Sequence, residues 1–269
     1  MERRDFLTFC GIAGLSAIAD STEVNSGPSP AAADKEIYEL RHYMIASAQK
    51  QEAFDRMLRT AAVPAWNRLG IKPVGVFKLA EGYPDEQKPL VNDLFVLLTH
   101  QSPQSVVNAV HGLVADPEFV KAAADVLDAP MKDPAYKRIE TSLFLAFDGF
   151  PKLQIPSTKP SRIFQLRIYE SHTHKACLKK IEMFNTGGEL DIFRRVGLTA
   201  VFFGEALAGT RIPNLTYMLG FDDGEQLKQR WAAFMADQQW AKLKADPQYK
   251  DTVSNITNIL LRPTAASQI

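Results

Sequence analysis

Runs of β-branched and aromatic residues alternate along the chain with segments whose apolar residues recur every three or four positions. The runs predict strands, and the recurring positions predict helices. The segment 48–69, for example, carries an apolar stripe that includes Phe54 and Leu58, and Gly70 then supplies a helix C-cap. Each half of the chain is therefore predicted to fold as β-α-β-β-α-β. The strands that follow the first helix are predicted at residues 74–77, 94–98 and 143–145 in the first half, and at 200–203, 215–219 and 259–261 in the second.

The two halves of the chain repeat one another. Leu-Arg-x-Tyr occurs at 40–43 and again at 166–169, an offset of 126 residues. After a shorter connection in the second half, Ala-Asp at 115–116 matches Ala-Asp at 236–237, an offset of 121 residues. A collinear series of such matches indicates an internal duplication. We therefore predict one domain at residues 36–149 and a second at residues 162–264. A proline-containing linker at residues 150–161 joins them.

A β-α-β-β-α-β unit forms a four-stranded antiparallel sheet with both helices on one face. The other face of that sheet still carries apolar residues and must be covered. Two copies in one chain can cover both faces by packing sheet against sheet. The predicted fold class is therefore α+β, with two tandem ferredoxin-like units whose sheets pack as a barrel-like pseudo-dimer around a cavity.

Three motifs of the first copy follow the order of a known family: Tyr-Glu-Leu-Arg-x-Tyr, Gly-Ile-Lys-Pro-Val-Gly-Val-Phe and Ala-Asp-Pro-Glu-Phe. Together with Leu-Arg-x-Tyr in the second copy, they make residues 36–147 and 162–263 resemble the NIPSNAP family of the dimeric α/β-barrel superfamily. The resemblance implies paired sheets that form a barrel. Relatives in the superfamily include cofactor-independent monooxygenases and haem-binding enzymes. The family supplies no catalytic residues to carry over, so these stay unknown.

The first residues resemble a twin-arginine export signal. Arg3-Arg4 is followed by a modest apolar segment that extends to Ala19. Cleavage sites of the Ala-x-Ala type end at Ala19 and at Ala33, and we favour the second because it lies just before the first predicted strand. Residues 1–33 are therefore predicted to be a signal peptide, and the protein to be periplasmic or secreted in a bacterium. The alternative is a buried N-terminal helix.

The composition narrows the range of partners. The chain has 31 Lys and Arg against 31 Asp and Glu among its 269 residues, so its formal net charge is zero. Without a basic stripe, we predict no nucleic-acid partner. No apolar run reaches the roughly 20 residues of a membrane-spanning helix, so we predict no membrane span in the mature chain. Removal of the signal takes away Cys10 and leaves Cys177 alone, which excludes an internal disulfide.

Two Arg–Tyr pairs are the candidate ligand-binding residues. Arg41 and Tyr43 alternate along one predicted strand, and Arg167 and Tyr169 do the same in the second copy. Each pair therefore shares one face of its strand. If these faces look into the barrel, the pairs would meet a small anionic or aromatic ligand, because Arg supplies fixed donors and Tyr an apolar ring with a polar tip. The alternative is structural, with each Arg in an ion pair and each Tyr packed beside it.

The histidines predict neither a metal nor a favoured cofactor. His172 and His174 form His-x-His, but no third ligand lies at close spacing, so we predict no metal site. His111 is the one histidine placed like a helical haem ligand. His42 and His100 are interpreted as satisfied or exposed residues. Haem is therefore the alternative to a protein without a cofactor.

Two functions follow from these patterns. The first is an exported NIPSNAP-like protein of unassigned activity that binds a small molecule between its sheets. The second is an enzyme of the cofactor-independent monooxygenase or haem type, with its pocket in the barrel. A further partner to consider is a second copy of the chain, in a homo-oligomer.

Overall fold

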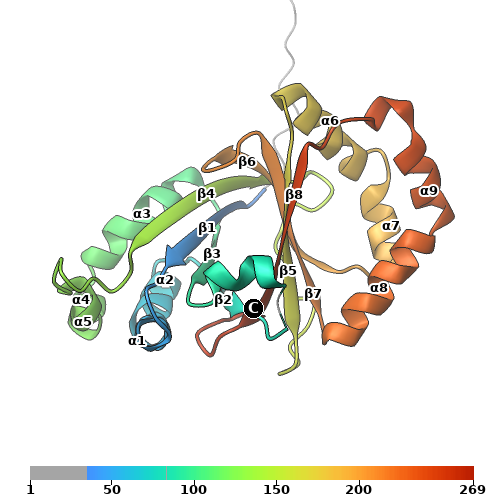
Figure 1. Ribbon diagram of the computed structural model, residues 1–269. Helices are drawn as coiled ribbons and strands as arrows, with labels where there is room; N and C mark the ends of the chain where they lie inside the picture. The colour runs from blue at the N-terminus through green and yellow to red at the C-terminus, as the bar shows by residue number, and fades with distance from the viewer. Residues whose placement is uncertain (1–34, 83) are drawn as a thin grey trace, which may run out of the picture. The chain divides into compact units, whose positions relative to one another are not determined.

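The computed structural model describes residues 35–82 and 84–269 (Figure 1). The predicted signal peptide, residues 1–33, lies outside the described residues. Strands occupy the places that the alternating pattern predicts, with bounds β1 Ile37–Met44, β2 Val74–Leu79, β3 Leu94–His100, β4 Arg138–Ala146, β5 Ile163–Glu170, β6 Ala200–Ala208, β7 Asn214–Phe221 and β8 Asn255–Pro263.

All eight strands join in one closed barrel in the order β1-β3-β2-β8-β5-β7-β6-β4, and β4 pairs back with β1. Every pairing is antiparallel. The first four strands are neighbours in the order β4-β1-β3-β2, and the last four in the order β8-β5-β7-β6. The prediction of a mixed α/β fold with antiparallel sheets that close into a barrel is thus confirmed.

Helices cover the outside of the barrel in two groups, one on each side of the view in Figure 1. The first group lies over β1 to β3, and the second lies over β5 and β7. Their bounds are α1 Ala48–Met57, α2 Val63–Arg68, α3 Pro103–Val114, α4 Pro117–Ala122, α5 Ala124–Leu127, α6 His174–Asn185, α7 Glu189–Val196, α8 Gly224–Ala236 and α9 Gln238–Ala245. Shorter helical segments are the π-helical turn η1 Leu58–Ala62 and the 3-10 helices η2 Asp85–Leu90 and η3 Pro247–Tyr249.

Local sequence explains where the helices begin and end. The side chain of Ser47 accepts a hydrogen bond from the Lys50 amide at the start of α1, and Thr173 does the same for Ala176 at the start of α6. The predicted helix over 48–69 is one continuous run, α1-η1-α2. In the second half the helical run is interrupted between α6 and α7, where Gly188 adopts a φ of 97° that favours glycine.

The alternation along each strand separates two kinds of apolar core. Side chains of one parity fill the barrel, and the large ones among them are Tyr38, Phe77, Phe95, Phe144, Phe164, Phe202 and Met218. Side chains of the other parity pack under the helices, in one cluster for each group of helices. No helix in the described part of the chain is both long and apolar enough to cross a membrane.

Candidate functional site

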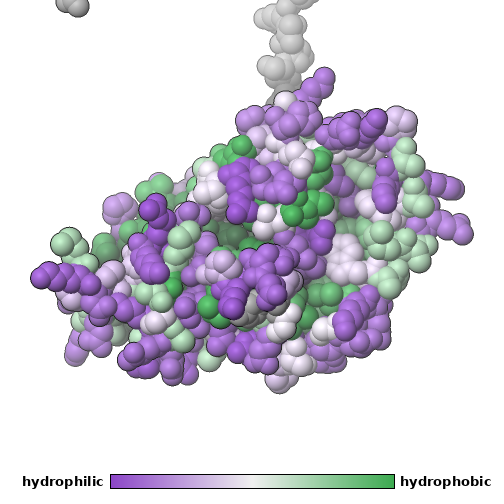
Figure 2. Space-filling model, viewed as in Figure 1, coloured by the Kyte–Doolittle hydropathy of each residue, from purple (hydrophilic) through white to green (hydrophobic). Residues whose placement is uncertain are grey.

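The barrel is filled toward one end and hollow toward the other. Tyr38 on β1 lies opposite Phe144 on β4, and Phe164 on β5 opposite Leu261 on β8, so large side chains meet at the filled end. Toward the other end lies a cavity of about 510 Å³. Its walls combine apolar and polar side chains from the barrel interior, among them Leu40, His42, Phe95, Glu140, Ser142 and Leu166. In the same view as Figure 1, hydrophobic surface is recessed among hydrophilic residues near the middle of this face (Figure 2).

His42 is the histidine on the wall of the barrel cavity. Its Nε2 lies 2.7 Å from Oδ2 of Asp93, and because an ionised carboxylate can only accept, Nε2 carries the hydrogen. The Ile45 amide donates to Oδ1 of Asp93 at 3.1 Å, which fixes the carboxylate. The His42 ring stacks on Phe95 with centroids 4.5 Å apart and planes 7° apart. Nδ1 has no hydrogen-bond partner within residues 35–82 and 84–269, so it is the ring nitrogen available to a ligand.

The loop around η2 closes the cavity on the side where the barrel wall is incomplete. Strands β2 and β8 pair over only Phe77–Leu79 and Leu261–Pro263. Beyond that point the Gln87 side chain donates to the Asn258 carbonyl at 2.8 Å and accepts from the Leu260 amide at 3.1 Å. The buried amide of Gln87 thus takes the place of a neighbouring strand.

Arg211 brings a positive charge to the edge of the same cavity. It lies in the turn before β7, with φ of 60°, a conformation that bulky side chains rarely adopt. Its Nη1 donates to the Thr257 hydroxyl at 2.7 Å and lies 3.9 Å from Oε1 of Glu170. Glu140 contributes the opposite charge to the lining. The cavity therefore has an apolar floor and a rim that presents both signs of charge.

The first predicted pair, Arg41 and Tyr43, lies outside the barrel. Both side chains point to the helix-covered face of β1, and Tyr43 belongs to the apolar cluster under α1 and α2. Arg41 is buried, with Nε 2.6 Å from Oε1 of Glu39 and its guanidinium 5.4 Å from the centre of the Trp66 ring. The pair thus meets the structural alternative, an ion pair beside a packed tyrosine.

The second predicted pair, Arg167 and Tyr169, occupies the matching place on β5, again outside the barrel. Nη2 of Arg167 donates to the Tyr169 hydroxyl at 2.9 Å, and the guanidinium stacks 4.7 Å from the Trp231 ring. The structure therefore does not bring the two pairs together, because each lies under its own group of helices. The condition under which they would share a ligand in the barrel is not met.

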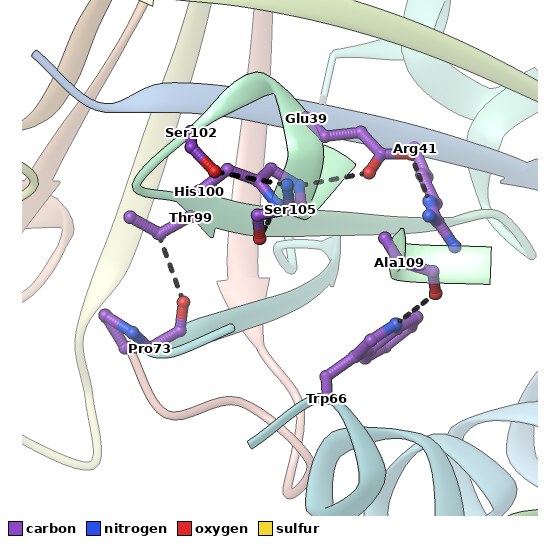
Figure 3. A network of polar contacts seen from close by, with 9 residues as sticks. All are labelled: Glu39, Arg41, Trp66, Pro73, Thr99, His100, Ser102, Ser105 and Ala109. Atoms are coloured by element: carbon purple, nitrogen blue, oxygen red, sulfur yellow. Dashed lines mark hydrogen bonds and ion pairs between the residues drawn. The ribbon is translucent and has the colours of Figure 1, made fainter. Parts of the chain in front are cut away.

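A chain of buried polar side chains leads from Arg41 to the start of α3 (Figure 3). Glu39 binds Arg41 through Oε1 and the His100 Nε2 through Oε2 at 3.2 Å, and the His100 Nδ1 lies 2.9 Å from the Ser105 hydroxyl. Burial by itself would raise the pKa of Glu39, but hydrogen bonds from His100 and Arg41 bring that pKa below its ordinary value. Since His100 is fully buried, this Ser–His–Glu row is a satisfied structural network.

The remaining histidines lie away from the barrel cavity. His111 is exposed on α3 and does not line that cavity, and His172 and His174 are exposed just before α6 and at its first residue. Among the described residues, no group of three or more His, Cys, Asp or Glu is arranged to hold a metal ion.

Comparison with known proteins supports the fold and shows similarity to one family over part of the chain. Residues 164–268 match the NIPSNAP family model, which confirms the predicted resemblance for that segment. No curated protein matches the chain significantly. For residues 36–147 the NIPSNAP resemblance stays a prediction.

Solved structures with similar backbones extend over most of the chain. A protein of Lactobacillus acidophilus NCFM, provisionally designated a monooxygenase, is 11% identical with a TM-score of 0.55, covering 85% of this chain and 94% of its own. An anthrone oxidase-like protein is 12% identical with a TM-score of 0.50, covering 87% of this chain and 93% of its own. A NIPSNAP-like domain protein of Burkholderia xenovorans is 21% identical over 40% of this chain and 90% of its own, with a TM-score of 0.36. The two long matches show a shared fold.

The cavity residues were not predicted, although the sequence carries part of the signal for them. His42 alternates with Leu40 along β1, so its place on the other face from Arg41 follows from the sequence. Its partner Asp93 is 51 positions away, and the two meet because His42 lies opposite Phe95 in the β1–β3 register. The sequence of either strand alone does not specify this register.

Proposed function

We propose that the protein binds a small, mainly apolar molecule that carries a hydroxyl or carbonyl group in the barrel cavity. The observation that supports this most directly is the 510 Å³ cavity with the His42–Asp93 pair on its wall. Leu40, Phe95 and Leu166 offer an apolar surface, and Nδ1 of His42 offers a polar contact. A concave apolar pocket with few polar groups is the usual form of a small-molecule site.

Calorimetric titration with 1-naphthol tests this proposal. Wild-type protein is expected to bind the probe, whereas Ser142→Phe, which fills the cavity, abolishes binding, and His42→Asn weakens it at least about tenfold. Val107→Phe on the exposed side of α3 is the matched control and leaves binding unchanged. Absence of binding by wild type, or equal binding by Ser142→Phe, would overturn the proposal.

The second candidate is a cofactor-independent monooxygenase, which the His42–Asp93 pair specifically favours. With Asp93 holding Nε2–H, Nδ1 of His42 can accept a proton from an acidic C–H or O–H group of a bound substrate. The resulting carbanion or phenolate would then react with O₂ in the cavity. The fold shared with the Lactobacillus protein and the anthrone oxidase-like protein is compatible with this chemistry.

Anthrone is a suitable probe for that second candidate, because its central CH₂ group is acidic and one similar structure is described as anthrone oxidase-like. The reaction consumes one O₂ and yields anthraquinone and one water. We expect O₂ uptake in an oxygen electrode to fall at least about 100-fold in His42→Asn. No uptake above the blank with wild type, or full activity in the variant, would leave ligand binding as the function.

We further propose that the barrel consists of two tandem ferredoxin-like units and that the family extends to the first. The first four strands and the last four follow the same spatial order, which supports this proposal. Equivalent elements also begin 126 residues apart, as in the pairs β1 and β5, α1 and α6, and α2 and α7. The barrel closes within one chain. A homo-oligomer stays a prediction that a mass measurement in solution would test.

Export through the twin-arginine route is also proposed, on the sequence of residues 1–33 alone. Changing Arg3 and Arg4 together to Lys is expected to retain the protein in the cytoplasm of its bacterial host. Mass spectrometry of the exported form would give its first residue. An unprocessed cytoplasmic wild-type protein would contradict export.

A further inference from the structure

A second cavity, of about 320 Å³, lies outside the barrel between β5 and the helices α6 to α9. We call it the Arg167 pocket, because Arg167 lies directly behind its wall. Its lining is mainly aromatic and includes Tyr169, Phe193, Trp231, Phe234 and Trp240. Lys180, Glu189 and Lys244 supply the charged groups of the lining.

The charges around this pocket do not balance. Nζ of Lys180 lies 2.6 Å from Oε2 of Glu189, and both side chains are buried. Arg167 has no carboxylate within ion-pair distance anywhere in residues 35–82 and 84–269, and its Nε lacks a hydrogen-bond acceptor there. Arg167, which is half-buried, and Lys180 are positive and Glu189 is negative, so positive charges outnumber negative ones at this place. A cation that is partly removed from water and has no ion-pair partner would be stabilised by an anion.

The same position in the first half of the chain shows what a balanced arrangement looks like. Glu39, which neutralises Arg41, is replaced by Gln165 at the offset of 126 residues. The Gln165 side chain instead accepts a hydrogen bond of 2.7 Å from Nε1 of Trp231. Phe54, which packs against Tyr43, is replaced by Lys180. The first replacement removes a negative charge, and the second adds a positive charge that is paired with Glu189, which replaces Val63.

A hydrogen-bond donor also faces the pocket. The Tyr169 oxygen accepts from Nη2 of Arg167 at 2.9 Å and from the Tyr217 hydroxyl at 3.1 Å. Tyr217 is fully buried, and Tyr169 is its one hydrogen-bond partner among the described residues, so the hydrogen between the two rings belongs to Tyr217. Burial raises the pKa of Tyr217 well above its ordinary value, which keeps that hydroxyl protonated. The hydrogen of Tyr169 is therefore left for an acceptor in the pocket.

We propose that the Arg167 pocket binds a small aromatic carboxylate. The hydroxyl of Tyr169 and the ammonium of Lys180 contact the carboxylate group, and Arg167 adds charge from behind Tyr169. The ring of the ligand packs among Trp231, Phe234 and Trp240, where aromatic contacts favour it. This site is independent of the barrel cavity and of the function proposed for it.

Tryptophan fluorescence provides the readout, since Trp231 and Trp240 line the pocket and the third tryptophan, Trp66, lies in the first half. Benzoate and 1-naphthoate are the probes, and benzamide is the neutral control. Wild type is expected to show saturable quenching by the carboxylates and at least tenfold weaker binding of benzamide, an order of magnitude typical of a charged hydrogen bond. No saturable response to either carboxylate, or equal affinity for benzamide, would overturn the proposal.

Variants in matched positions separate binding from folding. Tyr169→Phe and Gln165→Glu should each weaken benzoate binding at least about tenfold, the first by removing the donor and the second by supplying Arg167 with a carboxylate. Tyr43→Phe, the matching change in the first half, should leave it unchanged. Gln165→Glu keeps both the shape of the side chain and the acceptor for Trp231, so it decides the matter if Tyr169→Phe fails to fold. Equal losses in Tyr43→Phe would contradict the assignment.

The two cavities can be told apart with the same proteins. Ser142→Phe, which fills the barrel cavity, is expected to leave benzoate binding intact. Gln165→Glu is expected to leave 1-naphthol binding intact. A loss of benzoate binding in Ser142→Phe would place the carboxylate in the barrel and overturn the second site.

Discussion

The two helix-covered faces of the barrel are built on the same strand positions but surround their arginines differently, with Arg41 buried and Arg167 half-buried. Around Arg41 the neighbours are Glu39 and His100, and no fully buried side-chain nitrogen or oxygen in the row to Ser105 lacks a hydrogen-bond partner. Around Arg167 the neighbours are two tyrosine hydroxyls and tryptophan rings, and a cavity remains beside them. The first face is a hydrogen-bonded structural network, whereas the second face contains a cavity.

The comparison teaches that a repeated motif need not carry a repeated role. Leu-Arg-x-Tyr positions Arg and Tyr identically on β1 and β5, since both strands pair in the same order with their neighbours. What differs is the residue two positions before each arginine and the residues that the helices bring over it. A buried cation depends strongly on those surroundings, because the desolvation of an unpaired charge is costly.

The largest expected effect comes from making the first face resemble the second. Glu39→Gln leaves Arg41 buried without a carboxylate and should lower the free energy of unfolding by about 3–5 kcal/mol. The reverse change, Gln165→Glu, gives Arg167 a partner and should alter it by no more than about 1 kcal/mol. Urea denaturation followed by circular dichroism measures both.

Glu118→Gln is the control for this pair of changes, because Glu118 is 80% exposed in its contact with Arg68. It should change the free energy of unfolding by no more than about 0.5 kcal/mol. If Glu39→Gln cost no more than this control, the two faces would not differ in the way the contacts indicate.

A smaller effect is expected from pH. The pKa of Glu39 lies below its ordinary value of 4.5, so the stabilisation from its charged form is complete above that value. It is lost as pH falls through the lower pKa of the folded state. The difference in unfolding free energy between wild type and Glu39→Gln should therefore be constant from pH 7 to about pH 5 and shrink below 4.5. A difference that stays the same down to pH 3 would argue against a charged Glu39.

The smallest effect concerns Cys177, a buried thiol of the second face. The matching residue of the first face, 126 positions earlier, is Gln51. Gln51 donates to the Asp93 carbonyl at 3.1 Å and so supports the loop that carries Asp93, the partner of His42. Burial, aided by Glu205, raises the pKa of Cys177 to about 11. The folded thiol should therefore stay neutral at pH 8 and react with a disulfide reagent at least about 100-fold more slowly than in urea.

This measurement uses a Cys10→Ser variant, in which Cys177 is the one remaining thiol. Because the raised pKa favours the neutral form in the fold, the contribution of this thiol to stability should decline as pH rises from 9 toward about 11. Rapid reaction of the folded protein at pH 8 would show that the second face opens far more readily than its burial indicates.

The strands and helices could be predicted because they depend on local patterns. Ser47 and Thr173 cap α1 and α6, and the helical run of the second half is interrupted at Gly187-Gly188. The strand-pairing order in each half is the one expected of a β-α-β-β-α-β unit. The resemblance to the NIPSNAP family was likewise predicted from the sequence, and the match over residues 164–268 confirms it for that segment.

The sequence by itself determined which residues share a face, because alternation along a strand is a property of the backbone. Arg41 and Tyr43 had to lie on one side of β1, with Leu40 and His42 on the other. Only the tertiary structure decided which side became the inside. Closure of the barrel turned the side with His42 inward, where register brought it to Asp93, and left the arginines outside under the helices. These outcomes depend on contacts between residues far apart in the chain, and no local pattern specifies them.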